Sequence, residues 1–332
     1  MKTTARIAIP AVMLLLSACG GGSSSDKLIP IITAPVTEAG TLFIADAGNR
    51  VLARLNTLTP IAGDSINAGV LSSSENYSMG IAYDVARNRL YASTGTQFAV
   101  FDNASNLRGN ITPGRLITPL AEGGGLYYNL QFDKGNDRLY AAYTRARGVN
   151  LAVFDNASNL AGNAPATRTV SGITDAYAVD TTRNILYTIR LSGGMASIQA
   201  VPDINRLNGA LPNVTPQIVP MAGSDVHAIA IDTTRDRLYL ALRGAGLGVI
   251  NNASTVLRAG AAPGSASAAL VSFPVDAARG AVSVDAAKDR VYFSQDNTVY
   301  VLRNASTLNG GADSGTVKIT TPVGSQFTGF AY

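Results

Sequence analysis

The most constraining feature of this chain is a segment that recurs roughly every 50 residues. Each copy has an aspartate, a short polar turn, and then a branched apolar residue followed by tyrosine or a close equivalent. The copies read DVARNRLYAS from Asp84, DKGNDRLYAA from Asp133, DTTRNILYTI from Asp180, DTTRDRLYLA from Asp232 and DAAKDRVYFS from Asp285. A period of this length is typical of solenoids and β-propellers, in which each repeat is one supersecondary unit.

A sixth, incomplete copy lies near the N-terminus. TLFIADAGNRV, from Thr41, places Phe43 at the tyrosine position, but the aspartate turn is missing in front of it. The chain finishes with GFAY from Gly329, which matches GIAY from Gly80. We therefore predict that the C-terminal strand joins the N-terminal blade and closes the ring. Such closure removes a free sheet edge, which would otherwise be a template for aggregation.

Within one copy, alternating apolar and polar residues predict short strands. In the second copy these strands are 80–84, 89–93, 98–107 and 111–118. Four short antiparallel strands per repeat are the signature of a propeller blade. The sequence thus predicts an all-β fold, a six-bladed β-propeller over residues 41–332 built from four-stranded antiparallel blades.

The first strand of each copy alternates small and large residues. Gly80 and Ala82 alternate with Ile81 and Tyr83, and the later copies repeat this pattern. Successive side chains of a strand point to opposite faces, so we predict that the small residues crowd the central axis and the large ones fill the space between blades. The third copy is the exception, because Asn129 and Gln131 replace the small residues and put two amides into the channel.

Two other repeated features have structural explanations. The aspartate that opens each polar turn is expected to accept hydrogen bonds from the backbone amides of that turn, which makes it structural rather than a calcium ligand. The tripeptide Asn-Ala-Ser recurs at Asn103, Asn156, Asn252 and Asn304 and matches the glycosylation sequon. In these repeats it is expected to turn the chain after the third strand, with serine as a local cap.

The N-terminus has the features of a secretory signal. Lys2 and Arg6 precede an apolar stretch from Ile7 to Leu16, which is too short for a transmembrane helix of ~20 residues. The sequence LSAC that follows resembles a bacterial lipobox, and its Cys19 is the only cysteine of the chain. The resemblance implies a signal peptide over 1–18 and a flexible tether over 19–40.

It also implies a lipid bilayer as partner, through acylated Cys19. Gly20 stands where an aspartate is associated with inner-membrane retention, so an outer-membrane lipoprotein of the cell envelope is expected, with its ring on either side of that membrane.

Charge and composition narrow the classes of partner. The net charge of +4 includes Lys2 and Arg6, and the remaining basic residues form no cluster that would neutralise several phosphates. We therefore expect no nucleic-acid partner. Without a second cysteine no intramolecular disulfide can form, and the ring must be stabilised by packing and hydrogen bonds. A monomer is expected.

Two of the repeat segments resemble known propeller families. FIADAGNRV is similar to the core of NHL repeats, and DTTRDRLYLA resembles the wider NHL/YVTN group of bacterial propellers. The resemblance extends over nearly all of residues 41–332. It implies an architecture and no particular activity, because this fold hosts lactonases, lyases, hydrolases and binding proteins alike.

Catalytic residue patterns are sparse, which favours a non-enzymatic function. His227 is the only histidine, and a Ser-His-Asp site would have to pair it with Asp225 on the same strand. The alternative hypothesis is a metal-dependent, lactonase-like hydrolase. It would place a cation such as Ca²⁺ at the channel mouth, with Asp175 and Asp225 as carboxylates and Asn129 as an amide ligand. No other cofactor is expected.

The favoured hypothesis is a membrane-tethered module that binds a protein, a glycan or a small ligand. Arg and Tyr are frequent anchors of interfaces, and the segment GGGLYYNLQ (123–131) combines flexible backbone, two aromatic rings and two amides. No catalytic or metal residue is assigned. The candidate ligand-binding residues, at the channel mouth and on the face of the loops that join strands four to one and two to three, are Tyr127, Tyr128, Asn129, Gln131, Asp175, His227 and Arg279.

Overall fold

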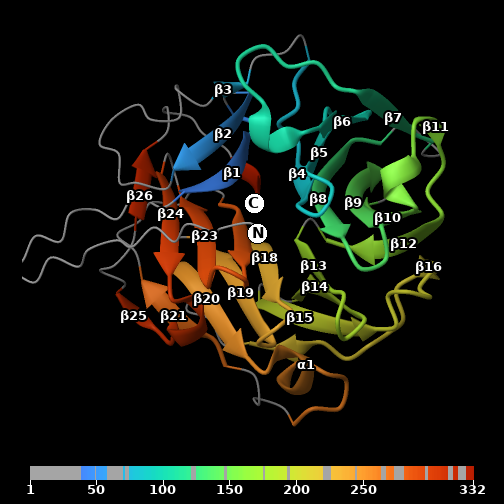
Figure 1. The fold of residues 1–332 in the computed structure, drawn as a ribbon. Coiled ribbons are helices and arrows are strands. Elements are labelled where there is room, and N and C mark those ends of the chain that lie inside the picture. The colour runs from blue at the N-terminus through green and yellow to red at the C-terminus, as the bar shows by residue number, and fades with distance from the viewer. Residues whose placement is uncertain are drawn as a thin grey trace, which may run out of the picture. The chain divides into compact units, whose positions relative to one another are not determined.

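The strands form six separate sheets that surround a common centre as the blades of a propeller (Figure 1). The computed structural model describes residues 39–48, 50–57, 70–71, 75–120, 125–145, 148–174, 176–192, 195–219, 226–243, 245–262, 267–272, 280–295, 298–312, 317–320 and 327–332. The six sheets confirm the predicted all-β, six-bladed propeller. Within the described residues, no helix has the length and apolar character needed to cross a membrane.

The strands of each blade follow one another from the centre of the ring outward, as in the repeat. Blade 1 contains β27 (Phe327–Ala331), β1 (Ala39–Asp46), β2 (Val51–Thr57) and β3 (Val70–Leu71). Blade 2 contains β4 (Ile81–Asp84), β5 (Arg89–Ser93), β6 (Phe98–Asp102) and β7 (Arg115–Pro119). Blade 3 contains β8 (Tyr127–Asp133), β9 (Arg138–Arg145), β10 (Gly148–Asp155) and β12 (Arg168–Ile173).

The second half of the ring is built in the same way. Blade 4 contains β13 (Tyr177–Asp180), β14 (Ile185–Ser192), β15 (Met195–Pro202) and β17 (Gln217–Ile218). Blade 5 contains β18 (Val226–Asp232), β19 (Arg237–Leu242), β20 (Gly246–Asn251) and β21 (Ala269–Ser272). Blade 6 contains β22 (Val282–Asp285), β23 (Arg290–Gln295), β24 (Thr298–Arg303) and β26 (Val317–Thr320).

Three short strands, each from the following blade, extend a blade at its outer edge. They pair in parallel with β7, β12 and β21, and they are β11 (Gly162–Ala164), β16 (Gly209–Ala210) and β25 (Gly311–Ala312). Blades 2, 3 and 5 thereby have five strands instead of the predicted four. Because an outer strand presents unpaired backbone groups, the added strand covers an edge and also links neighbouring blades.

The two ends of the described chain meet in blade 1, as the repeat pattern predicts. β27 pairs antiparallel with β1, with Phe43 opposite Ala331 and Ala45 opposite Gly329. β1 begins at Ala39, two residues before the predicted start of the propeller. Segments from both ends of the sequence are thus hydrogen-bonded within one sheet, and this pairing closes the ring.

The inner strands correct one detail of the predicted packing. Large residues do fill the space between blades, since Ile229 and Ile231 of β18 pack against blade 4. The small residues, however, also lie at blade interfaces, because Ala176 and Ala178 belong to that same cluster. Each blade stands radially, so the edge of its inner strand faces the axis and both side-chain faces contact neighbouring blades.

The aspartate turns have the predicted structural role. In blade 5, Asp232 is fully buried, and its Oδ1 accepts the backbone amides of Thr234 at 2.9 Å and Arg235 at 3.0 Å. Its Oδ2 accepts Arg235 Nη1 at 2.9 Å, and the same guanidinium donates to the carbonyl of Ala286 in blade 6 at 3.0 Å. Blades 2 and 4 repeat the carboxylate contacts. We call this side of the ring the turn face.

The Asn-Ala-Ser tripeptides connect the third strand to that same turn. Their asparagines adopt positive φ, for example 55° at Asn156. Ser158 then donates its amide to Asp137 Oδ1 at 3.1 Å and its hydroxyl to Oδ2 at 2.6 Å. The structure therefore confirms a turn, with serine capping the Asp turn of its own blade. The short helices that follow the asparagines are Ala104–Asn106, Ala157–Asn159, α1 (Ala253–Val256) and Ala305–Thr307.

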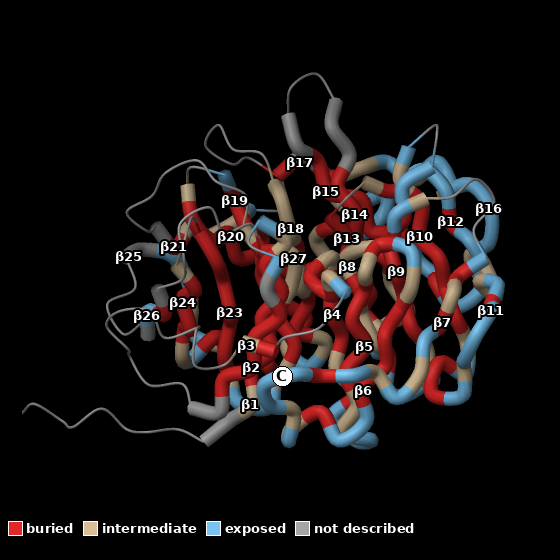
Figure 2. The backbone as a smooth tube through the Cα atoms, turned by 90° about the horizontal axis from the view of Figure 1, so that it is seen from above, coloured by how far each residue is buried: buried red, intermediate tan, exposed pale blue. Residues whose placement is uncertain are grey.

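The repeat tyrosines lie in the packing between blades, and in blade 5 the tyrosine and the arginine also hydrogen-bond to the next blade. The five repeat tyrosines are among the largest fully buried side chains of the protein, and Figure 2 shows the buried strand interiors between exposed turns. Tyr239 donates its hydroxyl to the carbonyl of Ala305 in blade 6 at 2.9 Å, and Arg237 Nη1 donates to the same carbonyl at 2.5 Å. The repeat motif thus encodes inter-blade contacts as well as strands.

Candidate functional site

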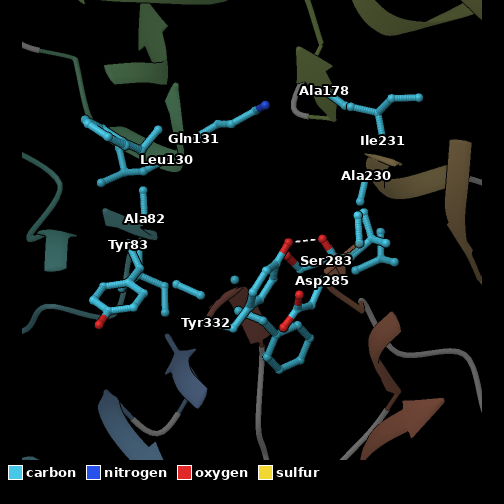
Figure 3. Close-up of a pocket in the computed structure, with 18 of the residues that line it drawn as sticks. Ala82, Tyr83, Leu130, Gln131, Ala178, Ala230, Ile231, Ser283, Asp285 and Tyr332 are labelled. Atoms are coloured by element: carbon cyan, nitrogen blue, oxygen red, sulfur yellow. Dashed lines mark hydrogen bonds between the residues drawn. The ribbon is translucent and has the colours of Figure 1, made fainter. Parts of the chain in front are cut away.

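The inner strands enclose a central cavity of about 650 Å³. This volume lies within the range of about 300–1,000 Å³ that is common for small-molecule sites. Its described wall includes residues from the inner strands of all six blades, and Figure 3 shows part of that wall, with Ala82, Gln131, Ala230 and Tyr332 around the opening. The channel is therefore the candidate site.

The inner strand of blade 3 has an irregular backbone where it enters the channel. Its register against β9 shifts between Tyr128 and Leu130, which makes Asn129 the extra residue of a β-bulge. Asn129 has a φ of 50°, in the left-handed region that side chains other than glycine rarely adopt. Asn129 lines the cavity, as the sequence predicts. Bulges of this kind redirect side chains and are frequent next to functional sites.

Blade 2 makes room for this bulge through a glycine. A Cβ atom added at Gly80 would lie 2.5 Å from the backbone nitrogen of Asn129. The equivalent glycine of blade 1, Gly329, has no such neighbour, since the nearest atom to its Cβ position is 3.6 Å away. Gly80 and the Asn129 bulge are therefore a matched pair, and neither can change independently.

Gln131 joins blade 3 to blade 4 through both atoms of its amide. Gln131 Oε1 accepts the backbone amide of Val179 at 2.9 Å, and Gln131 Nε2 donates to the carbonyl of Val179 at 2.8 Å. The side chain thus pairs with an inner-strand edge as another strand would. In Figure 3 it extends from beside Leu130 toward Ala178. Gln131 lines the channel as predicted, and it also holds two blades together.

Tyr177 completes this contact from the other side. Its hydroxyl donates to the backbone carbonyl of Asn129 at 2.5 Å, so blade 4 holds the bulge of blade 3 in place. Burial raises the pKa of the Tyr177 hydroxyl well above its ordinary value of 10, and the nearby hydroxyls of Tyr140 and Tyr128 raise it further. The hydroxyl therefore remains a protonated donor throughout the neutral range.

At two of the other joints between inner strands, a side-chain hydroxyl forms a hydrogen bond to the neighbouring blade. At the joint of blades 6 and 1, Tyr332 donates its hydroxyl to the carbonyl of Val284, the contact drawn as a dashed line beside Ser283 in Figure 3. At the joint of blades 1 and 2, Thr328 donates its hydroxyl to the carbonyl of Ser78. Sequence analysis did not single out Tyr177 or Tyr332 as site residues, because both stand at large-residue positions of the inner-strand pattern, and Thr328 precedes the GFAY segment.

The two predicted tyrosines of blade 3 do not face the channel mouth. Tyr127 is 2% exposed and packs edge-on against Phe98, with ring centroids 5.3 Å apart, and stacks on Tyr143. It lies in the core between blades 2 and 3, because it points to the face of β8 opposite that of Tyr128. Tyr128 is half-buried and packs against the cluster between blades 3 and 4. The two rings thus pack on opposite faces of β8, next to the bulge.

The remaining predicted residues lie at the loop end of the channel or outside the described chain. His227 is half-buried and is the extra residue of a second bulge, since the register of β18 against β19 shifts between Val226 and Ala228. Asp175 and Arg279 lie outside the described residues, as do Cys19 and the signal segment.

The hypothesis of a channel cation rests partly on these undescribed positions. Within the described chain, no group of three or more His, Cys, Asp or Glu side chains is arranged to hold a metal ion. Asp175 and Asp225, the two carboxylates that the hypothesis requires, are not among the residues described. The calcium site therefore stays a prediction.

Ionised side chains line the described channel only at its turn end, and they are balanced. They are two aspartates and two lysines, Asp133, Lys134, Asp285 and Lys288. Asp133 Oδ1 accepts the backbone amides of Gly135 at 2.9 Å and Asn136 at 3.2 Å. Asp285 Oδ2 lies 3.4 Å from Lys288 Nζ. The carboxylates are thus engaged by their own turns, and the described wall above them has amides, hydroxyls and apolar groups.

Comparisons with known proteins support the fold alone. No family model matches the chain, and no curated protein matches it. Among solved structures, 702 chains are similar. One is a functionally unknown protein from Desulfotomaculum acetoxidans, which is 11% identical with a TM-score of 0.50, over 88% of this chain and 80% of that chain. Because one fold hosts many functions, this likeness carries no activity to the present chain.

Proposed function

We propose that this protein is a lipid-tethered binding module of the NHL/YVTN type, whose central channel holds its ligand. The observation that carries the proposal is the cavity of about 650 Å³, whose wall contains the two inner-strand amides of blade 3. Those amides interrupt an otherwise regular repeat. The repeated residues are sufficient to build a blade. Residues that depart from the repeat at a concave, partly polar site are therefore expected to serve function.

The proposed tether rests on Cys19 and on the direction of β1. Phe43 pairs with Ala331, near the end of β27 that leads to the turn face, so β1 starts on that face. The described part of the proposed tether's attachment is thus Ala39, on the turn face.

The channel is tested by filling it. Ala230 lines the cavity and is half-buried, so Ala230→Trp would occupy the space of a ligand. A control is Ala86→Trp, the same change at an exposed turn position outside the cavity wall. The purified protein in detergent is melted with a library of saccharides, peptides and small metabolites, since a ligand of the native state raises Tm.

We expect one compound class to raise Tm in the wild type and in Ala86→Trp, and not in Ala230→Trp. A stabilising compound that acts equally on Ala230→Trp would show that the channel is not the site. Absence of any stabilising class would contradict the binding function itself.

The tether is tested separately by mass spectrometry of the mature N-terminal peptide. We expect acyl chains on Cys19 in the wild type, and loss of both the acyl chains and the outer-membrane fraction in Cys19→Ser. An unmodified wild-type cysteine would contradict the tether and leave the channel proposal standing.

A further inference from the structure

We propose that the channel ligand is a neutral saccharide, held at the Asn129–Gln131 wall of blade 3. This inference rests on the proposed function, because it assigns a ligand class to the same channel. It follows from three properties of the described wall: where its charges lie, which hydrogen-bonding groups it offers, and how these groups are fixed.

The charges at the channel disfavour an ionised ligand. The two lysines and two aspartates of the described wall cancel in number and all lie at the turn end. Asp133 is 3% exposed and Asp285 is 4% exposed, and both are held by their own turns. An anion or cation deeper in the channel would lose hydration without meeting a counter-charge from the described inner-strand residues, which is costly in a site of low polarity.

The hydrogen-bonding groups suit hydroxyls, which both donate and accept. A glutamine amide has two N–H donors and two acceptor lone pairs. The contact with Val179 uses one donor and one acceptor of Gln131, so one of each remains directed along the wall. The hydroxyl oxygen of Tyr177 donates to Asn129 and keeps its acceptor capacity. A sugar hydroxyl can accept a hydrogen bond from the donors of this wall and donate one to its acceptors. An anionic group can only accept, and an ammonium group can only donate.

The wall across the channel is apolar. Ala178, Ala230 and Ile231 contribute to it, and Figure 3 shows them on the side of the opening opposite Ala82 and Leu130. A pyranose ring has hydroxyls around its rim and C–H groups on its faces. It can therefore hydrogen-bond to blade 3 while its apolar face covers the alanines and isoleucine of blades 4 and 5.

The amide wall is rigid before any ligand arrives. Asn129 is fixed by its bulge, by Gly80 behind it and by the Tyr177 hydroxyl on its carbonyl. Gln131 is fixed at both amide atoms by Val179. Immobilised polar side chains lose little conformational entropy on binding, so they favour affinity more than flexible ones do. A bulge that costs backbone energy is retained where it places a group for recognition.

The test uses a substitution that deletes one amide without disturbing the bulge. Asn129→Gly removes the side chain and keeps a residue that accepts a φ of 50°. Asn156→Gly is the matched control, because Asn156 has a φ of 55° and lies on an exposed turn after β10, outside the cavity wall. Each protein is purified in detergent, checked for an unchanged Tm, and applied to an array of neutral and acidic oligosaccharides.

We expect the wild type and Asn156→Gly to bind a neutral oligosaccharide, and Asn129→Gly to bind the same one about tenfold more weakly, as expected for one lost hydrogen bond in a desolvated site. The dissociation constants are measured by calorimetry.

Three results would overturn the inference. They are binding of acidic oligosaccharides only, equal affinity of Asn129→Gly and Asn156→Gly, and no glycan binding at all. In the last case, Tm shifts by a peptide or metabolite that Ala230→Trp abolishes would preserve the channel function and reject the saccharide. An absence of any Tm shift would reject both.

Discussion

The inner strand of blade 3 differs from the inner strands of the other five blades in how it meets its neighbours. At the joint of blades 4 and 5, Ala178 packs against Ile229, an apolar contact that the repeat encodes. At the joint of blades 3 and 4, Gln131 replaces the alanine and makes two hydrogen bonds to Val179. The joints of the ring therefore differ in how far hydrogen bonds supplement packing, and at the joint of blades 3 and 4 a single side chain makes two of them.

The difference shows how the repeat accommodates a polar residue at this position: both polar atoms of the Gln131 amide find a partner in the neighbouring blade. A buried amide without partners would cost about 1–3 kcal/mol, and Gln131 avoids this cost by pairing with the edge of β13. The clamp in turn depends on the Asn129 bulge and on Gly80. An exception at one residue thus required matching residues in three consecutive blades.

The largest expected effect concerns the joints that follow the repeat. Burial is the first cause that raises the pKa values of Tyr239 and Tyr292, each to about 12. The unfolded chain ionises its tyrosines near pH 10, whereas these folded tyrosines stay protonated to higher pH. Their stabilisation is therefore complete below pH 10 and is lost as the pH rises from 10 through 12.

Chemical denaturation from pH 7 to 11.5, with tyrosinate absorbance as second readout, measures this loss. We expect the unfolding midpoint to fall steeply above pH 10, together with the appearance of tyrosinate. A midpoint that stays constant to pH 11.5 would contradict the role given to the buried repeat tyrosines.

The second effect tests the pairing of Gly80 with the bulge. Gly80→Ala places a methyl group 2.5 Å from a backbone atom that cannot move alone. We expect a loss of about 2–3 kcal/mol in the free energy of unfolding, in the range of overpacked cores. Gly329→Ala, at the equivalent position with 3.6 Å of space, should change it by less than about 0.5 kcal/mol. Equal effects in urea titrations would mean that the bulge does not restrict Gly80.

The third effect tests the clamp itself. Gln131→Ala restores the residue type of the other blades but leaves the amide and carbonyl of Val179 to the channel. We expect a loss of about 1–2 kcal/mol, because two hydrogen bonds are removed where water can replace part of them. Ser283→Ala, at the equivalent position of blade 6, is the comparison and should cost less, because it removes one hydroxyl that hydrogen-bonds Tyr332. If Gln131→Ala were as mild as Ser283→Ala, the joint would be held by packing, like the joint of blades 4 and 5.

The smallest effect separates binding from stability. We expect Asn129→Gly to lower the free energy of unfolding by less than Gln131→Ala does, because glycine adopts positive φ without strain and the Tyr177 contact uses only the backbone of residue 129. Thermal melts of the two proteins check this. A large loss of stability would assign the Asn129 side chain to the fold and remove it from the proposed ligand site.

Sequence patterns predicted the fold well because the repeated residues form the same short-range contacts in each copy. Asp232 with its turn, Tyr239 after it and Asn252 before α1 each satisfy groups only a few residues or one blade away. The same patterns placed Asn129 and Gln131 at the channel, since they stand in register with the small residues of other copies. They failed for Tyr127. Because it follows a run of glycines, it was predicted on an exposed loop, whereas β8 begins at this residue and buries its ring.

The amino-acid sequence by itself determined the number of blades, the strand order and the shared blade at the ends of the chain, because these follow from a period and from short-range contacts that every copy repeats. The tertiary structure alone decided what the exceptions do. The clamp from Gln131 to Val179 and the hydrogen bond from the Tyr177 hydroxyl to Asn129 join residues 48 positions apart across a blade joint. No local pattern specifies such contacts, since each depends on how two blades pack side by side.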